Sequence, residues 1–272
     1  MKTSILFSVL LLAFSINAAN AQKEIPAAYL KLLPNDLKLD NSIVRSYRMT
    51  TDYYDFDLNS NFLAKRRITG IITYETDSAQ WKDVYYAESK VQDETFSQGE
   101  KQHFLQDFKY RPNENVLTSE FFSDYLPEAN PFVMNLIWDA LGFDALAYCC
   151  WDSLKLNEEF LSKNINSELK IAIGTFENRD IRITWLGITK INGKICAVLK
   201  YSAMNNPLKL EYGNMSMSGR SHYWGEIYVS LSDKQIEYAN LMEDVITDVN
   251  IKGREKNILG YTTRYINLSK IK

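Results

Sequence analysis

Glu226 and Glu243 are the residues whose positions suit acid–base chemistry, because they flank a short turn at Ser232-Asp233-Lys234. Glycosidases use two carboxylates held at a defined separation. A three-residue loop would place the two glutamates on opposite faces of the hairpin, whereas a four-residue loop would shift the register by one and bring them onto one face. An Asp/Glu hydrolase is therefore one hypothesis, and a pair of solvated strand residues is the alternative.

Metal and cofactor chemistry finds little support in the sequence. The two histidines, His103 and His222, lie far apart, and three cysteines cannot form a four-cysteine zinc site. No nucleophile-elbow, Walker or dinucleotide-binding motif occurs. Segment 55–61 begins like a calcium loop, but Ser60 replaces the glycine and Arg66 the final glutamate, so we predict a strand that ends in a polar turn. We expect no catalytic residue, no cofactor and no metal site.

The three cysteines, Cys149, Cys150 and Cys196, are too few for a disulfide-rich scaffold. In an oxidising compartment we expect one disulfide, which joins Cys196 to either Cys149 or Cys150. The alternative is that all three stay reduced and are buried as small apolar residues. The sequence leaves both arrangements open.

Aromatic residues are the remaining candidates for a binding surface, since the chain has five Trp and 17 Tyr. Trp138 and Trp151 fall in a helical segment, and Trp185 and Trp224 fall in strands. If a cavity lies between these segments, we expect the four tryptophans to line it as ligand-binding residues. Ordinary core packing and cross-strand pairing are the alternative explanation.

The N-terminus has the three parts of a secretory signal peptide. Lys2 forms the basic region, residues 5–14 form an apolar run too short to span a bilayer, and Ala19-Asn20-Ala21 fits the cleavage rule. We therefore predict that residues 1–21 are removed before Gln22 and that the protein is exported. Loss of Lys2 changes the formal charge from −3 to −4, a balance that argues against nucleic acid as a partner.

Hydrophobic patterning predicts a single domain over residues 22–272, in which a helical insertion at about residues 119–163 interrupts a series of strands. Asn130-Pro131 is a typical helix start, and the helix that follows is apolar on all sides. Asp139 and Asp144 make it a poor membrane span, so we do not expect an integral membrane protein. About ten strands are expected, at 42–56, 64–75, 81–89, 170–177, 181–191, 194–204, 208–217, 222–231, 235–249 and 258–268, with 104–110 as a further candidate.

Asn192-Gly193, between two β-rich runs, predicts a type I′ turn in which both residues have positive φ. That turn would pair Thr189 with Cys196 and Leu186 with Leu199. Both faces of this hairpin then carry apolar side chains, whereas an antiparallel sheet with one free face alternates apolar and polar residues. We therefore expect other parts of the protein, or a ligand, to shield both faces from water. We expect an α+β fold, with a strongly curved antiparallel β-sheet and a helical insertion packed on or in it.

The expected order is a short N-terminal helix, antiparallel strands, a helical insertion and a long meander. This order resembles the periplasmic lipoprotein-carrier family, which implies an unfinished β half-barrel whose helices plug an apolar cavity. Segments 221–230 (SHYWGEIYVS) and 233–239 (DKQIEYA) are also similar to uncharacterised exported proteins of Bacteroides-type bacteria. The resemblance implies a location in the periplasm or at the outer-membrane periphery, and it identifies no functional residue.

These features predict an exported, non-enzymatic protein that binds or carries an apolar ligand, which would be a lipid, an acyl chain or a lipoprotein. The hypothesis depends on a sheet with two apolar faces and on a helix that is apolar on all sides. A cell-envelope scaffold or a glycan-binding module is the alternative, and it predicts exposed Trp or Tyr in a shallow groove.

Overall fold

Two strands from opposite ends of the described chain, β1 (Arg45–Asp57) and β13 (Ile258–Lys270), pair in the middle of one antiparallel sheet. In the computed structural model, Asp36–Lys272 forms one compact unit. The structure describes residues 37–112, 116, 118, 121, 130–163, 165, 167–171 and 174–271. The predicted signal peptide, its cleavage site before Gln22 and most of segment 119–129 lie outside the described residues.

The remaining strands are β2 (Phe62–Tyr74), β3 (Ala79–Ser89), β4 (Glu100–Lys101), β5 (Phe108–Tyr110), β6 (Glu159–Ser162), β7 (Ser167–Ile171), β8 (Gly174–Asn178), β9 (Ile181–Ile191), β10 (Lys194–Tyr212), β11 (Met215–Ser230) and β12 (Ile236–Ile251). The sheet order is β4-β3-β2-β1-β13-β12-β11-β10-β8-β7, with β5 also on β3, β9 also on β10 and β6 on β9. Within the described residues the two ends of this order do not pair, so the sheet is open.

The sheet has thirteen strands in the described residues, more than the ten or so expected. Segment 170–177 was expected to be one strand, but it divides between the hairpin strands β7 and β8. Segment 208–217 also spans two strands, because a turn at Gly213, with φ 59°, ends β10 and begins β11. Hydrophobic runs on either side of a tight turn therefore resembled single strands.

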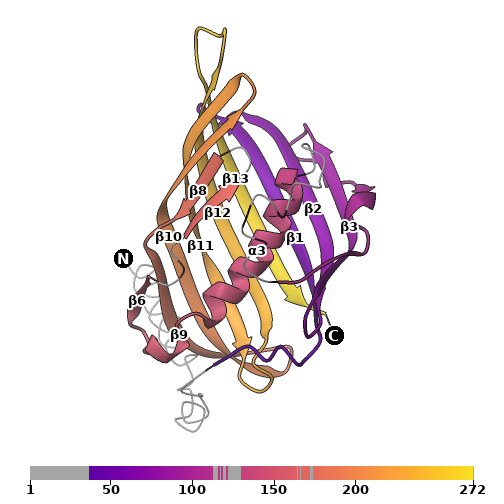
Figure 1. Cartoon of the computed structure of the whole chain (residues 1–272), viewed down its shortest axis with the longest axis vertical. Coiled ribbons are helices and arrows are strands. Elements are labelled where there is room, and N and C mark those ends of the chain that lie inside the picture. The colour runs from indigo at the N-terminus through magenta and orange to yellow at the C-terminus, as the bar shows by residue number, and fades with distance from the viewer. Residues whose placement is uncertain are drawn as a thin grey trace, which may run out of the picture. The chain divides into compact units, whose positions relative to one another are not determined.

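Helix α3 (Asn130–Tyr148) begins where the sequence predicted and lies across the concave face of the sheet, with its C-terminal end towards β9 (Figure 1). It is the one α-helix among the described residues, which also form two short 3-10 turns, His103–Leu105 and Trp151–Ser153. The helical insertion was expected to extend to about residue 163, which is wrong, because β6 pairs with β9 in the sheet. The architecture is mostly antiparallel β-sheet with one helix on it.

One described segment, Val133–Ser153, is long and apolar enough to cross a membrane by length and composition alone. Half of it is buried inside the structure. A helix in the core of a folded domain has the same length and composition, so this feature is weak evidence for a membrane span.

The Asn192-Gly193 turn forms as predicted, since both residues have positive φ, 51° and 84°. The predicted pairing of Leu186 with Leu199 is wrong, because Leu199 lies opposite Trp185. A bulge in β9 leaves Leu186 as an extra residue with 40% of its surface exposed. The bulge moves Trp185 onto the same face of the sheet as Leu199.

The turn between β11 and β12 combines a longer loop with a bulge. The Ser230 amide donates a hydrogen bond to the Gln235 carbonyl at 2.8 Å, and this bond closes a four-residue loop. The register then shifts at Glu237, which is an extra residue in β12. Beyond this bulge the strands have the register of a three-residue loop. Glu226 and Glu243 therefore lie on opposite faces of the sheet.

The polar turn predicted after β1 forms around Asp57. Asp57 Oδ1 accepts hydrogen bonds from the backbone amides of Asn59 and Asn61, each at 2.9 Å. Ser60, between them, has a φ of 62°. In a calcium loop the Asp57 carboxylate would bind the ion, but here it stabilises the turn through these two hydrogen bonds.

The two faces of the sheet are distinguished by their relation to α3. Residues directly opposite each other on paired strands share a face, so the face beneath α3 can be followed outward from Arg264, which contacts the helix. We call this the inner face and the other the outer face. One inner row crosses five strands and is buried along its whole length: Leu199, Ile227, Ala239, Leu268 and Met49.

Candidate functional site beneath helix α3

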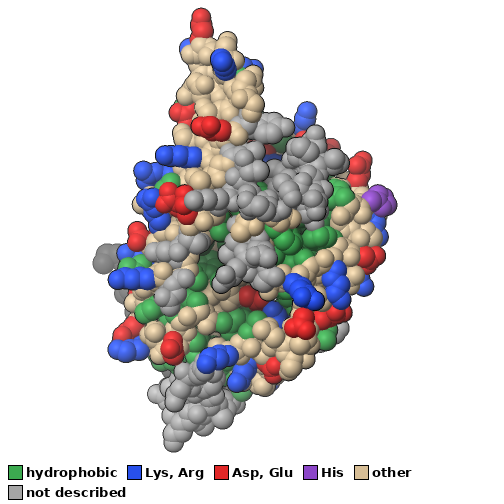
Figure 2. Space-filling view, in the orientation of Figure 1, with side chains coloured by type: hydrophobic (Ala, Val, Ile, Leu, Met, Phe, Trp, Pro, Cys, Tyr) green, Lys and Arg blue, Asp and Glu red, His purple; other side chains and the backbone are tan. Residues whose placement is uncertain are grey.

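Helix α3 packs an apolar side against the inner face. Its buried side chains recur every three or four residues, as one side of a helix requires. They are Val133, Met134, Leu136, Ile137, Ala140, Phe143, Leu146 and Ala147. Figure 2 shows hydrophobic side chains gathered over the middle of this face, with charged side chains along its edges. Into this apolar layer α3 brings two charged residues, Asp139 and Asp144.

The first charged contact joins α3 to β12 and β13. Arg264 Nη2 lies 2.7 Å from Asp139 Oδ1, and Arg264 Nε lies 2.6 Å from Glu243 Oε2. The hydroxyl of Ser221 donates to the other Glu243 oxygen. Burial raises the pKa of Asp139 to about 6, although the positive charge of Arg264 opposes this shift. In this Arg264 cluster (Arg264, Asp139, Glu243 and Ser221) two carboxylates share one arginine.

The second charged contact joins α3 to β1. Arg45 Nη2 lies 2.8 Å from Asp144 Oδ2, and the arginine is 4% exposed. Its guanidinium carbon lies 4.2 Å from the centroid of the Tyr74 ring, a cation–π arrangement. The Tyr47 ring packs edge-on against Tyr74, with ring centroids 6.2 Å apart. We call Arg45, Tyr47, Tyr74 and Asp144 the Arg45 cluster.

Three hydrogen-bond donors of the Arg45 cluster have no acceptor in the described part of the chain. They are the hydroxyls of Tyr47 and Tyr74 and the Nε of Arg45. A tyrosine hydroxyl is protonated at neutral pH, and burial raises the pKa of both tyrosines further, so both hydroxyls are available as donors. A buried donor without an acceptor costs about 1–3 kcal/mol. The cluster is therefore under-satisfied while α3 is in this position.

Sequence reasoning named neither Arg45 nor Arg264. It used Asp139 and Asp144 only as an argument against a membrane span. A carboxylate buried in an apolar helix requires a partner of opposite charge, so the two aspartates were a signal that two cations lie on the facing surface. Their identity among the 31 Lys and Arg residues depends on long-range strand pairing.

The four tryptophans that we expected to line one cavity do not come together. Trp151 and Trp185 are neighbours, with ring centroids 5.7 Å apart. Trp138 Nε1 donates to the carbonyl of Val116 at 2.7 Å. Trp224 pairs with Met242 on the outer face, so the sheet separates it from the other three. Ligand binding by these residues stays a prediction, but the four do not form a single lining.

All three cysteines carry free thiols in the structure, so the expected disulfide from Cys196 to Cys149 or Cys150 is not formed. Cys196 lies opposite Thr189, as the turn predicted, and alternates along β10 with residues of the inner face. Its side chain is therefore on the outer face. Cys149 and Cys150 follow the C-terminal end of α3, which covers the inner face, so the sheet separates them from Cys196.

The predicted carboxylate pair does not converge. Glu226 is on the outer face, where its carboxylate accepts the Tyr228 hydroxyl at 2.5 Å, whereas Glu243 is in the Arg264 cluster. The polar cleft with two facing glutamates that the hydrolase hypothesis requires is therefore absent from these strands. Among the described residues, no group of three or more His, Cys, Asp or Glu is arranged to hold a metal ion.

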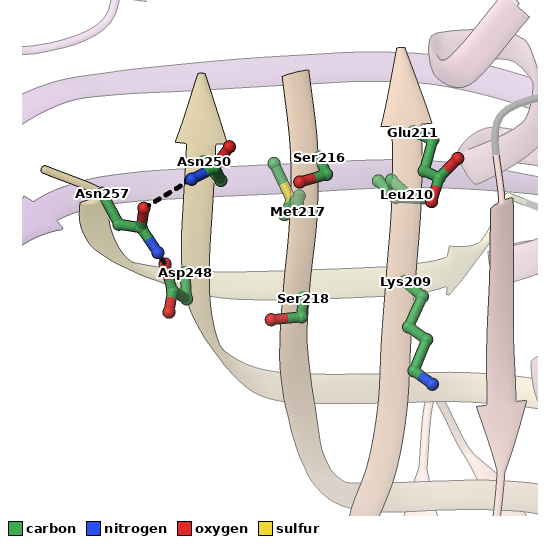
Figure 3. Close-up of a pocket in the computed structure, with 9 residues that line it drawn as sticks. All are labelled: Lys209, Leu210, Glu211, Ser216, Met217, Ser218, Asp248, Asn250 and Asn257. Carbon is green, nitrogen blue, oxygen red and sulfur yellow. Dashed lines mark hydrogen bonds between the residues drawn. The ribbon is translucent and has the colours of Figure 1, made fainter. Parts of the chain in front are cut away.

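A shallow depression of about 200 Å³ lies on the outer face, near the ends of β10, β11 and β12 (Figure 3). Seven of its nine lining residues are polar, among them Lys209, Ser218 and Asp248. Asn257 reaches into it and donates to Asp248 Oδ1 at 2.6 Å. Asn250 in turn donates to Asn257 Oδ1 at 2.9 Å, so the two amides and the Asp248 carboxylate at one side of the depression are paired with one another.

The outer face carries an aromatic and apolar strip that no described residue covers. Trp224, Met242 and Tyr265 pair in one row across β11, β12 and β13. Met242 and Tyr265 are each 39% exposed, and Ile246, on the same face of β12, is 48% exposed. The tyrosine ring of Tyr54 packs edge-on against Tyr265, with centroids 6.0 Å apart. The expectation that both faces are covered therefore holds for the inner face only.

Comparison with known proteins assigns no family. No protein-family model and no curated protein sequence matches the chain. Among solved structures, lipovitellin, in a structure that describes lipid–protein interactions, matches 86% of this chain with 12% sequence identity and a TM-score of 0.36. The chain spans about a quarter of lipovitellin, 26% of its length.

Two further structures match at lower scores. The match to a DUF1329 family protein from Desulfovibrio piger covers 82% of this chain and 85% of that one, with 10% identity and a TM-score of 0.14. The match to the binding domain of botulinum neurotoxin serotype C1 covers 85% and 84%, with 7% identity and a TM-score of 0.14. At these scores the likenesses assign neither a fold nor a ligand, so function has to be argued from the inner face itself.

Proposed function

We propose that the protein binds or carries an apolar ligand, which would be a lipid, an acyl chain or a lipoprotein acyl group, on the inner face of its sheet. In this proposal α3 occupies the ligand's place until the ligand enters. The observation that carries the proposal is the character of α3. Its buried side is apolar, and three of its more accessible positions, Leu141, Gly142 and Ala145, are apolar or small as well. A permanent surface helix has a largely polar outer side, whereas the half-buried positions of α3 include few polar residues besides Asn135 and the two paired aspartates.

The charged contacts of α3 support its displacement. A buried ion pair contributes little net stability, because the cost of removing two charges from water offsets their attraction. Apolar side chains at Asp139 and Asp144 would bind the helix to the inner face more firmly. The two ion pairs instead define the position of α3. The unpartnered donors of the Arg45 cluster lower the stability of the arrangement in which α3 packs on the inner face.

The location and the finer architecture belong to the same proposal. An export signal at residues 1–21 would deliver the protein to the periplasm or the outer-membrane periphery. An open antiparallel sheet that curves around one helix is compatible with the half-barrel of periplasmic lipoprotein carriers. N-terminal sequencing of protein recovered from a periplasmic extract should begin at Gln22, and an unprocessed Met1 would contradict export by this signal.

Native mass spectrometry of protein purified from a periplasmic extract, followed by solvent extraction, tests ligand binding directly. We expect an added mass that extracts as a lipid, and saturable uptake of the neutral fluorescent probe N-phenyl-1-naphthylamine that palmitate competes away. A bare protein mass together with no probe uptake would overturn the proposal. The outer-face variant Met242→Ser/Tyr265→Ser is the matched control, because both residues are exposed and the inner face is unchanged.

The outer-face strip favours one second candidate function, a cell-envelope scaffold or glycan-binding module. Exposed aromatic rings beside polar groups suit the faces and hydroxyls of sugar rings. Retention of the protein on envelope glycans, with loss of retention in Met242→Ser/Tyr265→Ser, would support this function. The same variant should leave uptake of the apolar probe unchanged if the inner face is the binding site.

A further inference from the structure

The Arg45 cluster has more hydrogen-bond donors than acceptors. Arg45 donates to Asp144 at 2.8 Å and to Asn41 Oδ1 at 3.3 Å, while its Nε and the hydroxyls of Tyr47 and Tyr74 donate to nothing in the described chain. Arg45, Tyr47 and Tyr74 are 4%, 1% and 4% exposed. Three unused donors around one guanidinium are complementary to a group with several lone pairs, such as a carboxylate or a phosphate.

Charge balance distinguishes this cluster from the other buried arginine. Arg264 lies beside two carboxylates, Asp139 and Glu243, so a further anion there would meet net negative charge. Among the residues that the structure describes, Arg45 forms an ion pair with Asp144 alone. If an incoming carboxylate replaces Asp144, the net charge around Arg45 does not change, and the unused donors gain acceptors; a phosphate monoester would bring more negative charge and more acceptor oxygens. An anionic group is therefore favoured at Arg45 and disfavoured at Arg264.

The inner positions next to the Arg45 cluster are apolar. Arg45 begins β1, and the next inner residues along that strand are Tyr47 and Met49. On β2, Tyr74 ends the strand and Ile72 is the inner residue before it. Polar groups thus lie at the ends of two adjacent strands, and apolar side chains follow on both. This order matches a molecule with a polar head and an apolar tail.

We infer that Arg45, Tyr47 and Tyr74 bind the anionic head of an acyl ligand, which is a carboxylate or a phosphate. The Asp144 carboxylate occupies the position of this head group while α3 lies on the inner face. The inference rests on the proposed function, because it needs an acyl chain on the inner face. In the loaded protein, the ligand's anionic oxygens replace the Asp144 carboxylate beside Arg45. The apolar tail then lies along the buried side chains of Met49 and Ile72.

Competition against bound N-phenyl-1-naphthylamine tests the inference with three ligands: palmitate, a monopalmitoyl glycerol phosphate and methyl palmitate. We expect the better of the two anionic ligands to bind the wild-type protein at least about tenfold more tightly than the uncharged ester, since hydrogen bonds to a charged group have that effect or a larger one. A preference for palmitate identifies a free carboxylate as the head, and a preference for the phosphate identifies a phospholipid-type head.

Tyr47→Phe and Tyr74→Phe supply the decisive comparison. Each variant should weaken binding of the preferred anionic ligand by about tenfold and leave binding of methyl palmitate unchanged. Each should also raise the melting temperature of the unliganded protein, because an unpartnered buried hydroxyl is removed. Opposite changes in stability and binding cannot come from partial unfolding.

Tyr201→Phe is the matched control, since the Tyr201 hydroxyl is also buried on the inner face but donates to the Asn240 carbonyl at 2.6 Å. It should lower stability and leave the preference for anionic ligands unchanged. Equal binding of the ester and both anionic ligands, with no effect of Tyr47→Phe, would overturn the head-group site and leave the proposed function intact. No binding of any acyl ligand or of the probe would overturn the proposed function itself.

Discussion

The stability of two tyrosine-to-phenylalanine variants should change in opposite directions. Tyr47 and Tyr201 are each 1% exposed and both lie on inner positions of the sheet. The Tyr47 hydroxyl has no hydrogen-bond partner in the described chain, whereas the Tyr201 hydroxyl donates to the Asn240 carbonyl at 2.6 Å. The same chemical change therefore removes an unfavourable group at one site and a hydrogen bond at the other.

The magnitudes follow from the state of each hydroxyl. Tyr47→Phe keeps the ring, so the edge-on contact with Tyr74 and the burial of the ring are retained. Removal of a buried unpartnered donor should raise the free energy of unfolding by about 1–3 kcal/mol. Tyr201→Phe loses a hydrogen bond and leaves the Asn240 carbonyl oxygen with one partner fewer, so the free energy of unfolding should fall by about 1–2 kcal/mol.

Equilibrium unfolding in urea, followed by tryptophan fluorescence, measures both changes. We expect the midpoint for Tyr47→Phe to lie above that of the wild type and the midpoint for Tyr201→Phe to lie below it, with equal slopes. If Tyr47→Phe lowers the midpoint as Tyr201→Phe does, the Tyr47 hydroxyl has an acceptor in solution. That result would refute the account of the Arg45 cluster as under-satisfied.

Three further predictions concern charge, packing and export. Burial raises the pKa of Asp139 from 3.8 to about 6, so the folded state binds this proton more tightly than the unfolded state. The free energy of unfolding should therefore fall as pH rises from about 4 to 6 by up to roughly 3 kcal/mol more than in Asp139→Asn, and equal pH profiles of the two proteins would contradict the assignment. Gly225→Ala should lower the free energy of unfolding by about 1–3 kcal/mol, because the new Cβ would overlap the Asn240 carbonyl oxygen and lie 2.7 Å from Tyr201 Oη. Its control, Gly142→Ala on α3, meets nothing within 4 Å and should raise stability by about 0.5–1 kcal/mol in the same urea assay. Replacement of the apolar run 5–14 by polar residues should retain the protein in the cytoplasm of a Gram-negative host, as fractionation and immunoblotting would show, and continued export would contradict the signal-peptide assignment.

Local sequence chemistry determined the elements of this protein and several of their ends. Asn192-Gly193 predicts a turn because both residues tolerate positive φ, and the structure shows φ of 51° and 84° there. Asn130-Pro131 predicted the start of α3 at Asn130. The β-branched and aromatic runs predicted antiparallel strands, although short turns such as the one at Gly213 were missed. These features depend on the preferences of a few neighbouring residues, which the sequence displays directly.

Tertiary structure alone decided which side chains meet at the candidate site. One extra residue at Leu186 and another at Glu237 change the face to which the following side chains point, and an alternating pattern that is apolar on both faces cannot reveal such bulges. The pairing of β1 with β13 joins segments about two hundred residues apart and brings Arg45 and Arg264 onto the face that α3 covers. The sequence showed two aspartates in an apolar helix that needed cations. Only the packed sheet identified those cations, because their positions depend on the sum of many distant contacts rather than on any local preference.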